Sequence, residues 1–266
     1  GYWAAFALGG GGSNASLQIG GGGQGIYING GLHSNDTLQI TTADKIELDE
    51  GQITWSKEGW SCPTGPNSGC NDSDPQAEYR APVSLQLPQY EEYEELAQTV
   101  GQTISGNHTC NGGTLGSTTQ PIIYITGNLT LQDCQVYGLI VVVGEVTMKG
   151  GVNGEYSIIA NGDIKVTGTN GTTAPNKPYT NPAYELLDDN VARLLSGEGD
   201  IGISGSGNKL AGGIIAENGE LSLSGSDNRI EGALIAESLS LIGAGNQIFY
   251  EEEYFPPQPD FIELMQ

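Results

Sequence analysis

A six-residue phrase returns three times in the last third of the chain, at 205–210, 225–230 and 243–248. Each copy reads glycine, a small residue, a variable residue, asparagine, a polar residue and an aliphatic residue. The copies follow one another about every 18–20 residues, a period typical of solenoid proteins. Two further phrases recur with the same period. One occurs at 194–196, 214–217 and 234–237, and the other at 200–203, 220–223 and 238–241.

Each repeat therefore holds three short strand-like phrases separated by turns. Aliphatic residues alternate with small or polar ones, which is the pattern of a half-buried strand. Such short strands bury a common core only when they stack in parallel. The chain is thus predicted to be all-β, a three-sided parallel β-helix or β-solenoid, with an irregular disulfide-bearing insertion and one or two short helices. Three hairpins of a β-sandwich are the alternative, but hairpins need not keep three phrases in phase.

The asparagine of the six-residue phrase recurs at Asn208, Asn228 and Asn246. Because the copies stand one coil apart, we expect these side chains to stack as a ladder in which each amide bonds the next. Glycine and asparagine also tolerate the positive φ that tight corners require.

The domain organisation follows the repeat. We predict the first coils over 1–55, an irregular acidic insertion over 56–121 and the main solenoid over 122–250. A loop and short helix should interrupt the main solenoid at 169–195, and an acidic tail rich in proline and aromatic residues covers 251–266. Residues 90–97, with their glutamates and tyrosines, are the strongest helix candidate in the insertion.

Charge limits the partners. The 266 residues carry only nine Lys and Arg and have a net charge of -23. Nucleic acids and anionic membranes are bound through basic patches, so neither is an expected partner. No stretch of about 20 apolar residues is present. We interpret the chain as a secreted mature product from which an export signal or anchor has been removed.

The cysteines indicate an oxidising compartment. They are Cys62, Cys70, Cys110 and Cys134. We predict disulfides 62–70 and 110–134, although three connectivities are open in principle. Zinc is the rival interpretation, but no CxxC pair exists and the two histidines are isolated. Disulfides favour an extracellular or cell-surface location.

Glycosylation sequons support the same location. Six asparagines stand in N-x-S/T motifs, which mark candidate surface glycans. They are Asn14, Asn35, Asn71, Asn107, Asn128 and Asn170.

Aromatic residues collect near both ends of the chain. We expect the two groups to lie at opposite ends of the solenoid, where they would cap the exposed strand edges or contact neighbouring subunits. The predicted interface residues are Tyr2, Trp3, Phe6, Phe249, Tyr250, Tyr254, Phe255 and Phe261.

The phrases 3–8 and 29–35, followed by the glycine and asparagine coils, resemble a known family. It comprises secreted β-helical proteins of bacteria and archaea that accompany Tad/Flp-type pilus assembly, described as TadE/TadG-like and PilX-like surface proteins. The resemblance implies a structural role at the cell surface and names no catalytic residues.

Motifs for catalysis are missing from the sequence. Asp133 and Asp163 have no evident partner, His33 is interpreted as a structural turn residue, and none of the common nucleophile, phosphate or metalloprotease motifs occurs. We therefore expect no enzyme activity. No cofactor is expected either: calcium could bind at 188–189 or 251–253, but these acidic runs lack the glycine-punctuated spacing of a calcium loop.

The preferred function is the subunit of a cell-surface filament or pilus-like fibre, with further copies of the chain or pilus components as partners. A glycan-binding adhesin or pilus accessory protein is the alternative, using the aromatic residues Trp55, Trp60, Tyr79, Tyr90 and Tyr93. A polysaccharide lyase or hydrolase is the third hypothesis.

Overall fold

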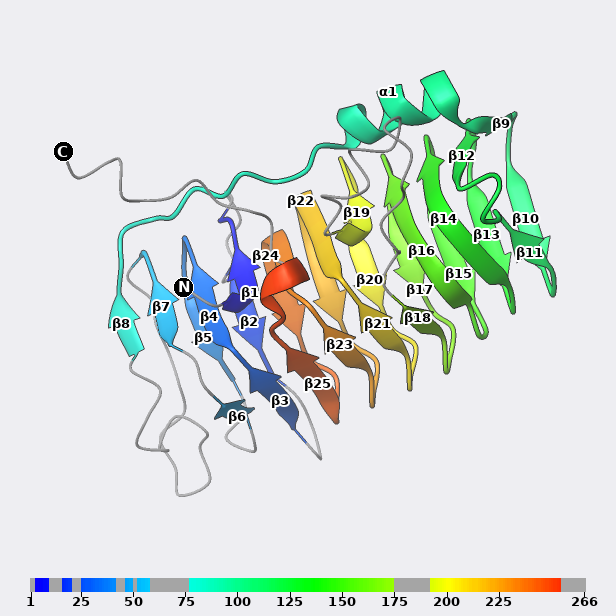
Figure 1. Cartoon of the computed structure of the whole chain (residues 1–266). Helices are drawn as coiled ribbons and strands as arrows, with labels where there is room; N and C mark the ends of the chain where they lie inside the picture. Colours follow the sequence, from blue (N-terminus) through cyan, green and yellow to red (C-terminus); the bar gives the residue numbers. More distant parts are fainter. Residues whose placement is uncertain are drawn as a thin grey trace.

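The computed structural model describes residues 3–9, 16–20, 25–41, 46–49, 52–57, 77–174 and 192–254. Their strands wind into a parallel β-solenoid of about nine turns, with one α-helix along its side (Figure 1). The predicted fold class is confirmed.

Three faces make up the solenoid. The first face contains β9 (Gln102–Ile104), β12 (Ile122–Ile125), β19 (Ala192–Ser196), β1 (Trp3–Ala7), β4 (Gly31–Ser34), β7 (Ile53–Trp55) and β8 (Ala77–Tyr79). The second contains β10 (His108–Asn111), β13 (Leu129–Gln132), β15 (Val146–Lys149), β17 (Ile164–Val166), β20 (Ile201–Ile203), β2 (Leu17–Ile19) and β5 (Leu38–Ile40). The third contains β11 (Thr114–Leu115), β18 (Thr172–Ala174), β21 (Lys209–Ala211), β23 (Arg229–Glu231), β25 (Asn246–Phe249), β3 (Ile26–Asn29) and β6 (Ile46–Asp49).

Longer strands turn a corner and belong to two faces. The third and first faces share β14 (Gln135–Val142) and β16 (Asn153–Ala160), and the first and second share β22 (Gly213–Leu223) and β24 (Leu234–Leu241). In β14 the corner falls at Gly138, whose φ of 88° is readily adopted only by glycine.

The order of the strands in space differs from their order in the chain. Along the first face it is β9, β12, β14, β16, β19, β22, β24, β1, β4, β7 and β8. The chain therefore starts in the middle of the solenoid and winds to one end. It returns along the outside through 80–89 and helix α1 (Tyr90–Val100), and then winds from the far end back toward its start (Figure 1).

Aliphatic columns fill the interior. On the second face Leu131, Met148, Val166 and Ile203 occupy the same register position of four successive coils and are all nearly inaccessible to solvent. Burial of each such side chain stabilises the fold by about 1.5–3 kcal/mol. The alternation seen in the sequence places one residue of each pair in such a column and the next outside.

The first face is buried on both sides, which explains its long aliphatic runs. In β14, Ile140 and Val142 point into the solenoid core, whereas Leu139 and Val141 belong to a second apolar layer outside it. Tyr90, Tyr93 and Ala97 of α1 complete that layer. A strand covered on both faces loses the alternating pattern.

Two boundary predictions are wrong and one is confirmed. Residues 102–115, assigned to the insertion, form a complete coil of β9, β10 and β11, because their short polar strands pair with the next coil. The short helix predicted to end at residue 195 does not include residues 192–195, which lie in β19, where pairing with β16 and β22 outweighs local helix preference. The strand phrase predicted at 194–196 is confirmed, since it pairs in register with 214–216. The helix predicted over 90–97 is present and extends to Val100.

Candidate functional site

The two ends of the described chain meet in the middle of the solenoid, at a junction that we call the seam. Strand β1 pairs with β24 on the first face, β2 with β24 on the second, and β3 with β25 on the third. Between β1 and β24, for example, Phe6 is in register with Ile235. The expectation that the aromatic groups lie at opposite ends of the solenoid is therefore wrong.

The aromatic side chains at the seam pack against other residues of the same chain. Phe6 is fully buried and Trp3 nearly so, and their rings meet edge to face at 5.1 Å. Across the seam, the rings of Tyr27 and Phe249 lie 5.4 Å apart. On the C-terminal side of the seam, the guanidinium of Arg229 lies 4.0 Å from the centre of the Phe249 ring. Such ring pairs stabilise an interface by more than the burial of their apolar surface alone would.

Other predicted interface residues give less information. Tyr250 is partly buried against the core, and Tyr254 ends the short 3₁₀ helix η2 (Glu252–Tyr254). Tyr2, Phe255 and Phe261 lie outside the described residues.

A buried histidine lies beside the seam. The ring of His33 is fully buried and lies 4.6 Å from the Phe6 ring and 5.2 Å from the Trp3 ring. Its Nδ1 is 2.6 Å from the hydroxyl of Thr54, and its Nε2 is 2.8 Å from Oδ1 of Asn35.

The partners of His33 define its neutral tautomer. Oδ1 of Asn35 also accepts the N–H of Val83, so it acts as an acceptor and Nε2 of His33 carries the proton. Nδ1 then accepts the hydroxyl of Thr54. Burial lowers the pKa of His33, and the charge of Arg80 lowers it further, against the opposing effect of the Asn35 hydrogen bond.

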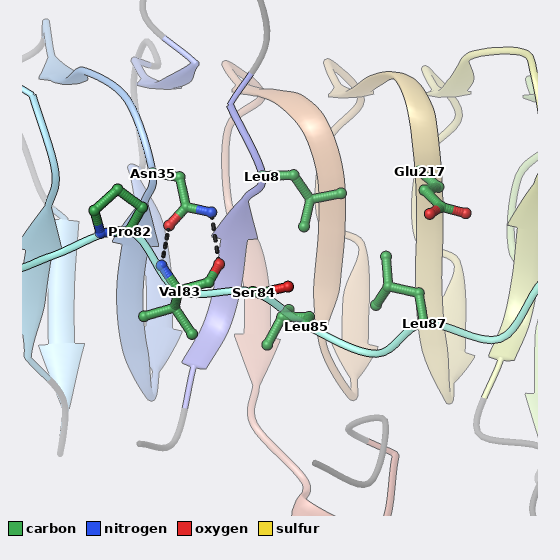
Figure 2. Close-up of a pocket in the computed structure, with 8 residues that line it drawn as sticks. All are labelled: Leu8, Asn35, Pro82, Val83, Ser84, Leu85, Leu87 and Glu217. Carbon is green, nitrogen blue, oxygen red and sulfur yellow. Dashed lines mark hydrogen bonds between the residues drawn. The ribbon is translucent and has the colours of Figure 1, made fainter. Parts of the chain in front are cut away.

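The extended segment 80–89, which we call the strap, crosses the outside of the first face. It belongs to no strand. Asn35 holds it by two hydrogen bonds, one from its Nδ2 to the carbonyl of Val83 and one from the Val83 N–H to its Oδ1, each 2.7 Å long (Figure 2). Farther along, Nε2 of Gln89 donates to the carboxylate of Glu217 at 2.9 Å.

Apolar side chains of the strap cover the sheet between these points. Val83, Leu85 and Leu87 alternate with exposed residues and pack on the outer apolar layer. Together with Leu8 and Glu217 they line a shallow, open pocket of about 340 Å³ (Figure 2). The pocket thus lies between two parts of the same chain.

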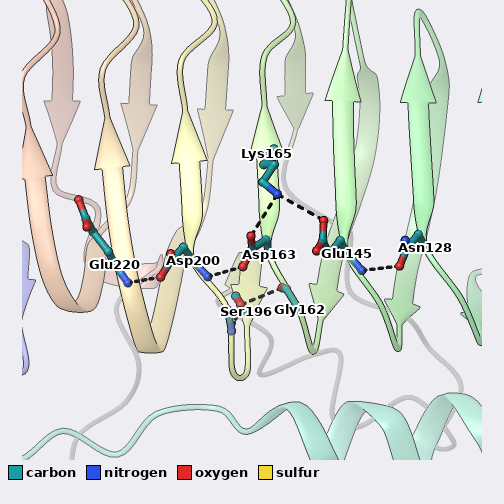
Figure 3. A network of polar contacts seen from close by, with 9 residues as sticks. Asn128, Glu145, Gly162, Asp163, Lys165, Ser196, Asp200 and Glu220 are labelled. Carbon is teal, nitrogen blue, oxygen red and sulfur yellow. Dashed lines mark hydrogen bonds and ion pairs between the residues drawn. The ribbon is translucent and has the colours of Figure 1, made fainter.

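A ladder of polar side chains follows the corner between the first and second faces. Oδ1 of Asn128 accepts the N–H of Glu145 at 3.0 Å, Oδ1 of Asp163 accepts that of Asp200 at 3.0 Å, and Oδ1 of Asp200 accepts that of Glu220 at 2.8 Å (Figure 3). Each side chain satisfies a backbone donor of the next coil.

Lys165 joins this ladder and gives Asp163 the partner that the sequence did not reveal. Its Nζ lies 3.1 Å from Asp163 and 3.3 Å from Glu145 (Figure 3). The N–H of Asp200 and then Lys165 hold the pKa of Asp163 below its usual value. An ionised carboxylate that already accepts these bonds is a poor proton donor, so the cluster suits a structural corner.

The predicted asparagine ladder is present inside another corner. Asn208, Asn228 and Asn246 are buried, and the Nδ2 atoms of the first two each donate to Oδ1 of the next at 3.0 Å. The same Oδ1 atoms accept the backbone N–H of the preceding asparagine at 3.1 and 3.0 Å. Side chain and backbone are thus bonded together across three coils.

A disulfide joins the first two coils at one end of the solenoid. The predicted bond between Cys110 and Cys134 is confirmed, and both residues are buried. Cys62 and Cys70 lie outside the described residues.

The sequons occupy different environments. The side chain of Asn35 is engaged by the strap, which leaves no room for a glycan on its Nδ2 while the strap is bound. Asn107 and Asn128 take part in the corner ladder through Oδ1. Asn170 is exposed with φ 58°, and Asn14 and Asn71 lie outside the described residues.

The solenoid ends carry strand edges. At one end β9, β10 and β11 pair on one side only within the described residues, and residues 102–115 contain no Asp, Glu, Lys, Arg or Pro. At the other end β5, β6 and β8 are the last described strands of their faces. Tyr79 of β8 is 64% exposed, next to Trp55 of β7 in register.

Comparison with models of known protein families, with curated proteins and with solved structures found no match to this chain. Within the described residues no helix is long and apolar enough to cross a membrane. The same residues hold no group of three or more His, Cys, Asp or Glu that could bind a metal ion. The acidic run at 188–189 lies outside the described residues.

Sequence reasoning missed the seam and the strap. The strap had a signal in the alternation of Val83, Leu85 and Leu87, which is a strand-like pattern outside the repeat. The sequence carried no signal for the role of Asn35, because its partner Val83 is 48 residues away. Tyr90 and Tyr93, considered for glycan binding, are buried on the side of α1 that packs against the solenoid.

Proposed function

We propose that this protein is an extracellular structural protein, the subunit of a cell-surface filament or pilus-like fibre built from solenoids joined head to tail. The observation that carries the proposal is the uncharged edge formed by β9, β10 and β11. Proteins usually protect such an edge with charges, prolines or a covering segment, and residues 102–115 contain neither charges nor prolines. The chain has a net charge of -23, yet this strand edge carries no charged side chain that would repel a second copy.

The polarity of the solenoid supports an open polymer. All of its pairings are parallel, and its two ends differ in sequence, so the contact between two copies is heterologous. A heterologous contact that does not close into a ring produces a fibre. Stacking β9–β11 of one copy on β5, β6 and β8 of the next would keep all strands in the same direction.

Several features support a location outside the cell. The disulfide between Cys110 and Cys134 favours an oxidising compartment. The exposed sequon at Asn170 offers a place for a glycan. The resemblance of the repeat to pilus-associated β-helical surface proteins agrees with this location, and the proposal includes no catalytic step.

Electron microscopy of native material tests the proposal. We expect regular fibres, and finding dispersed rods alone would refute it. Thr109→Pro is the matched variant: His108 directs its N–H to the next coil, so the N–H of Thr109 faces the open edge. Proline there removes an edge donor and should abolish fibres, whereas Thr109→Ala should retain them.

A glycan-binding adhesin remains the second candidate because one observation favours it. Trp55 and Tyr79 are neighbours on adjacent strands at one end, and the Tyr79 ring is exposed. Aromatic rings at a wet surface suit sugar binding. A glycan-array signal that disappears in Tyr79→Ala and persists in Tyr137→Ala would favour this function over the filament.

A further inference from the structure

The helical path of the solenoid has one covalent break within its length. Going from β9 along the coils, the chain reaches Phe249 and Tyr250, and the next position of the path is taken by β1, which begins at Trp3. Tyr250 lies in the corner of its coil against Gly30, the corner residue of the following coil. The stack of coils is therefore continuous in space across this point, although no peptide bond joins Tyr250 to β1.

Contacts across the break are as complete as those between covalently joined coils. All three faces are paired at the seam. Backbone hydrogen bonds also cross it outside the strands, from Leu8 to Ala236 at 2.8 Å, from Leu239 to Ser16 at 2.7 Å and from Gly20 to Leu241 at 2.8 Å. The surface that the C-terminal coil presents thus fits the N-terminal coils, whichever copy supplies them.

The covalent link between the two sides of the seam is the strap with α1. Strap residues 80–89 lie outside the strand ladder and are held by Asn35, Glu217 and apolar packing. Ten extended residues and an 11-residue helix span roughly 49 Å. The strands of the first face from β8 to β9 span roughly 48 Å at the usual strand spacing. The strap is thus long enough to bridge two bodies once it leaves the face.

We propose that the seam is an exchange interface, at which the coils within residues 3–79 of one copy stack on the coil of β24 and β25 of a second copy. Every contact of the seam is kept and only the chain that provides it changes, as in domain swapping. Because each copy offers one N-terminal block and one C-terminal coil, the exchange continues from copy to copy. The inference rests on the proposed structural function and adds the seam as a second contact that the fibre needs, beside the stacking of β9–β11 on β5, β6 and β8.

Cysteine pairs placed across the seam test the exchange directly. Gln18 and Ser240 are register partners on the second face, and both are partly exposed. Two differently tagged chains, one with Gln18→Cys and one with Ser240→Cys, are produced together in an oxidising compartment. We expect a disulfide-linked heterodimer, since the two cysteines meet only when the N-terminal coils of one chain dock on the other.

The control pair lies on the same face, one coil away. Gln18 is also in register with Gln39, and both residues belong to the N-terminal coils. Chains with Gln18→Cys and Gln39→Cys should give no heterodimer, because the two positions stay in one block. A heterodimer yield across the seam that does not exceed the control several-fold would overturn the exchange.

A second measurement separates this inference from the filament proposal. The double variant Gln18→Cys/Ser240→Cys, oxidised as a monomer, locks the seam within one chain, and Gln18→Cys/Gln39→Cys is its control. Loss of fibres in the locked variant alone supports exchange. Fibres in wild type and in both variants would overturn exchange and leave the filament intact. A heterodimer without wild-type fibres would support exchange and refute the filament.

Discussion

Removing the central asparagine of the buried ladder should destabilise the solenoid far more than removing a similar residue from the exposed ladder. Asn228 donates to the carbonyl of Gly205 at 3.0 Å, and its Oδ1 accepts the backbone N–H of Asn208 at 3.1 Å. In Asn228→Ala these two backbone groups lose their partner in a place that water does not reach. At about 1–3 kcal/mol for each orphaned group, the free energy of unfolding should fall by about 4 kcal/mol.

Asn128→Ala provides the comparison. It removes one hydrogen bond, to the N–H of Glu145, at an exposed corner where water can take its place. We expect a loss of about 1 kcal/mol or less. Asn228→Asp tests the cause, because it keeps the size of the side chain and replaces the donor by an oxygen that faces the acceptors of Gly205 and Asn246. It should be at least as destabilising as Asn228→Ala.

The free energies are measured by urea denaturation followed by circular dichroism, with the same slope expected for all variants. Equal losses for Asn228→Ala and Asn128→Ala would refute the argument that burial of the ladder makes it strong. A stable Asn228→Asp variant would refute the role of its donor.

Three further predictions concern other parts of the fold. Lowering the pH through about 6.5 should destabilise the wild type more than His33→Gln, because burial lowers the pKa of His33, and the unfolded chain then takes up the proton first; parallel pH dependences of the two unfolding free energies would contradict this. Cys110→Ala/Cys134→Ala should lower stability by about 3 kcal/mol and speed hydrogen exchange at 102–115, whereas uniform exchange along the solenoid would show that the bond does not anchor the end coil. Gly225→Ala should lower stability by about 3 kcal/mol or more, since its Cβ would overlap a backbone carbonyl of the neighbouring coil, while Gly202→Ala, where a Cβ meets open space, should change it by less than about 0.5 kcal/mol; similar melting temperatures for the two would be inconsistent with the close stacking.

The sequence predicted what short phrases encode. The corner phrase with Asn228 repeats once per coil, so its period and its amide chemistry both follow from adjacent residues. Helix 90–100 was recognisable for the same reason, because helix formation depends on neighbours three and four residues apart. The coil at 102–115 was missed because its strands are short, polar and weakly patterned, and only pairing with the next coil defines them.

The sequence does not predict which coils stack on one another. Every coil presents the same kind of parallel edge and aliphatic interior, so the pattern of one coil does not say which coil lies beside it. Local residues thus determined that the chain winds into a solenoid and where its corners fall. The tertiary structure alone decided that β1 stacks on β24 and that Asn35 clasps a strap 48 residues away, because these contacts join segments whose complementarity appears only when the whole fold is assembled.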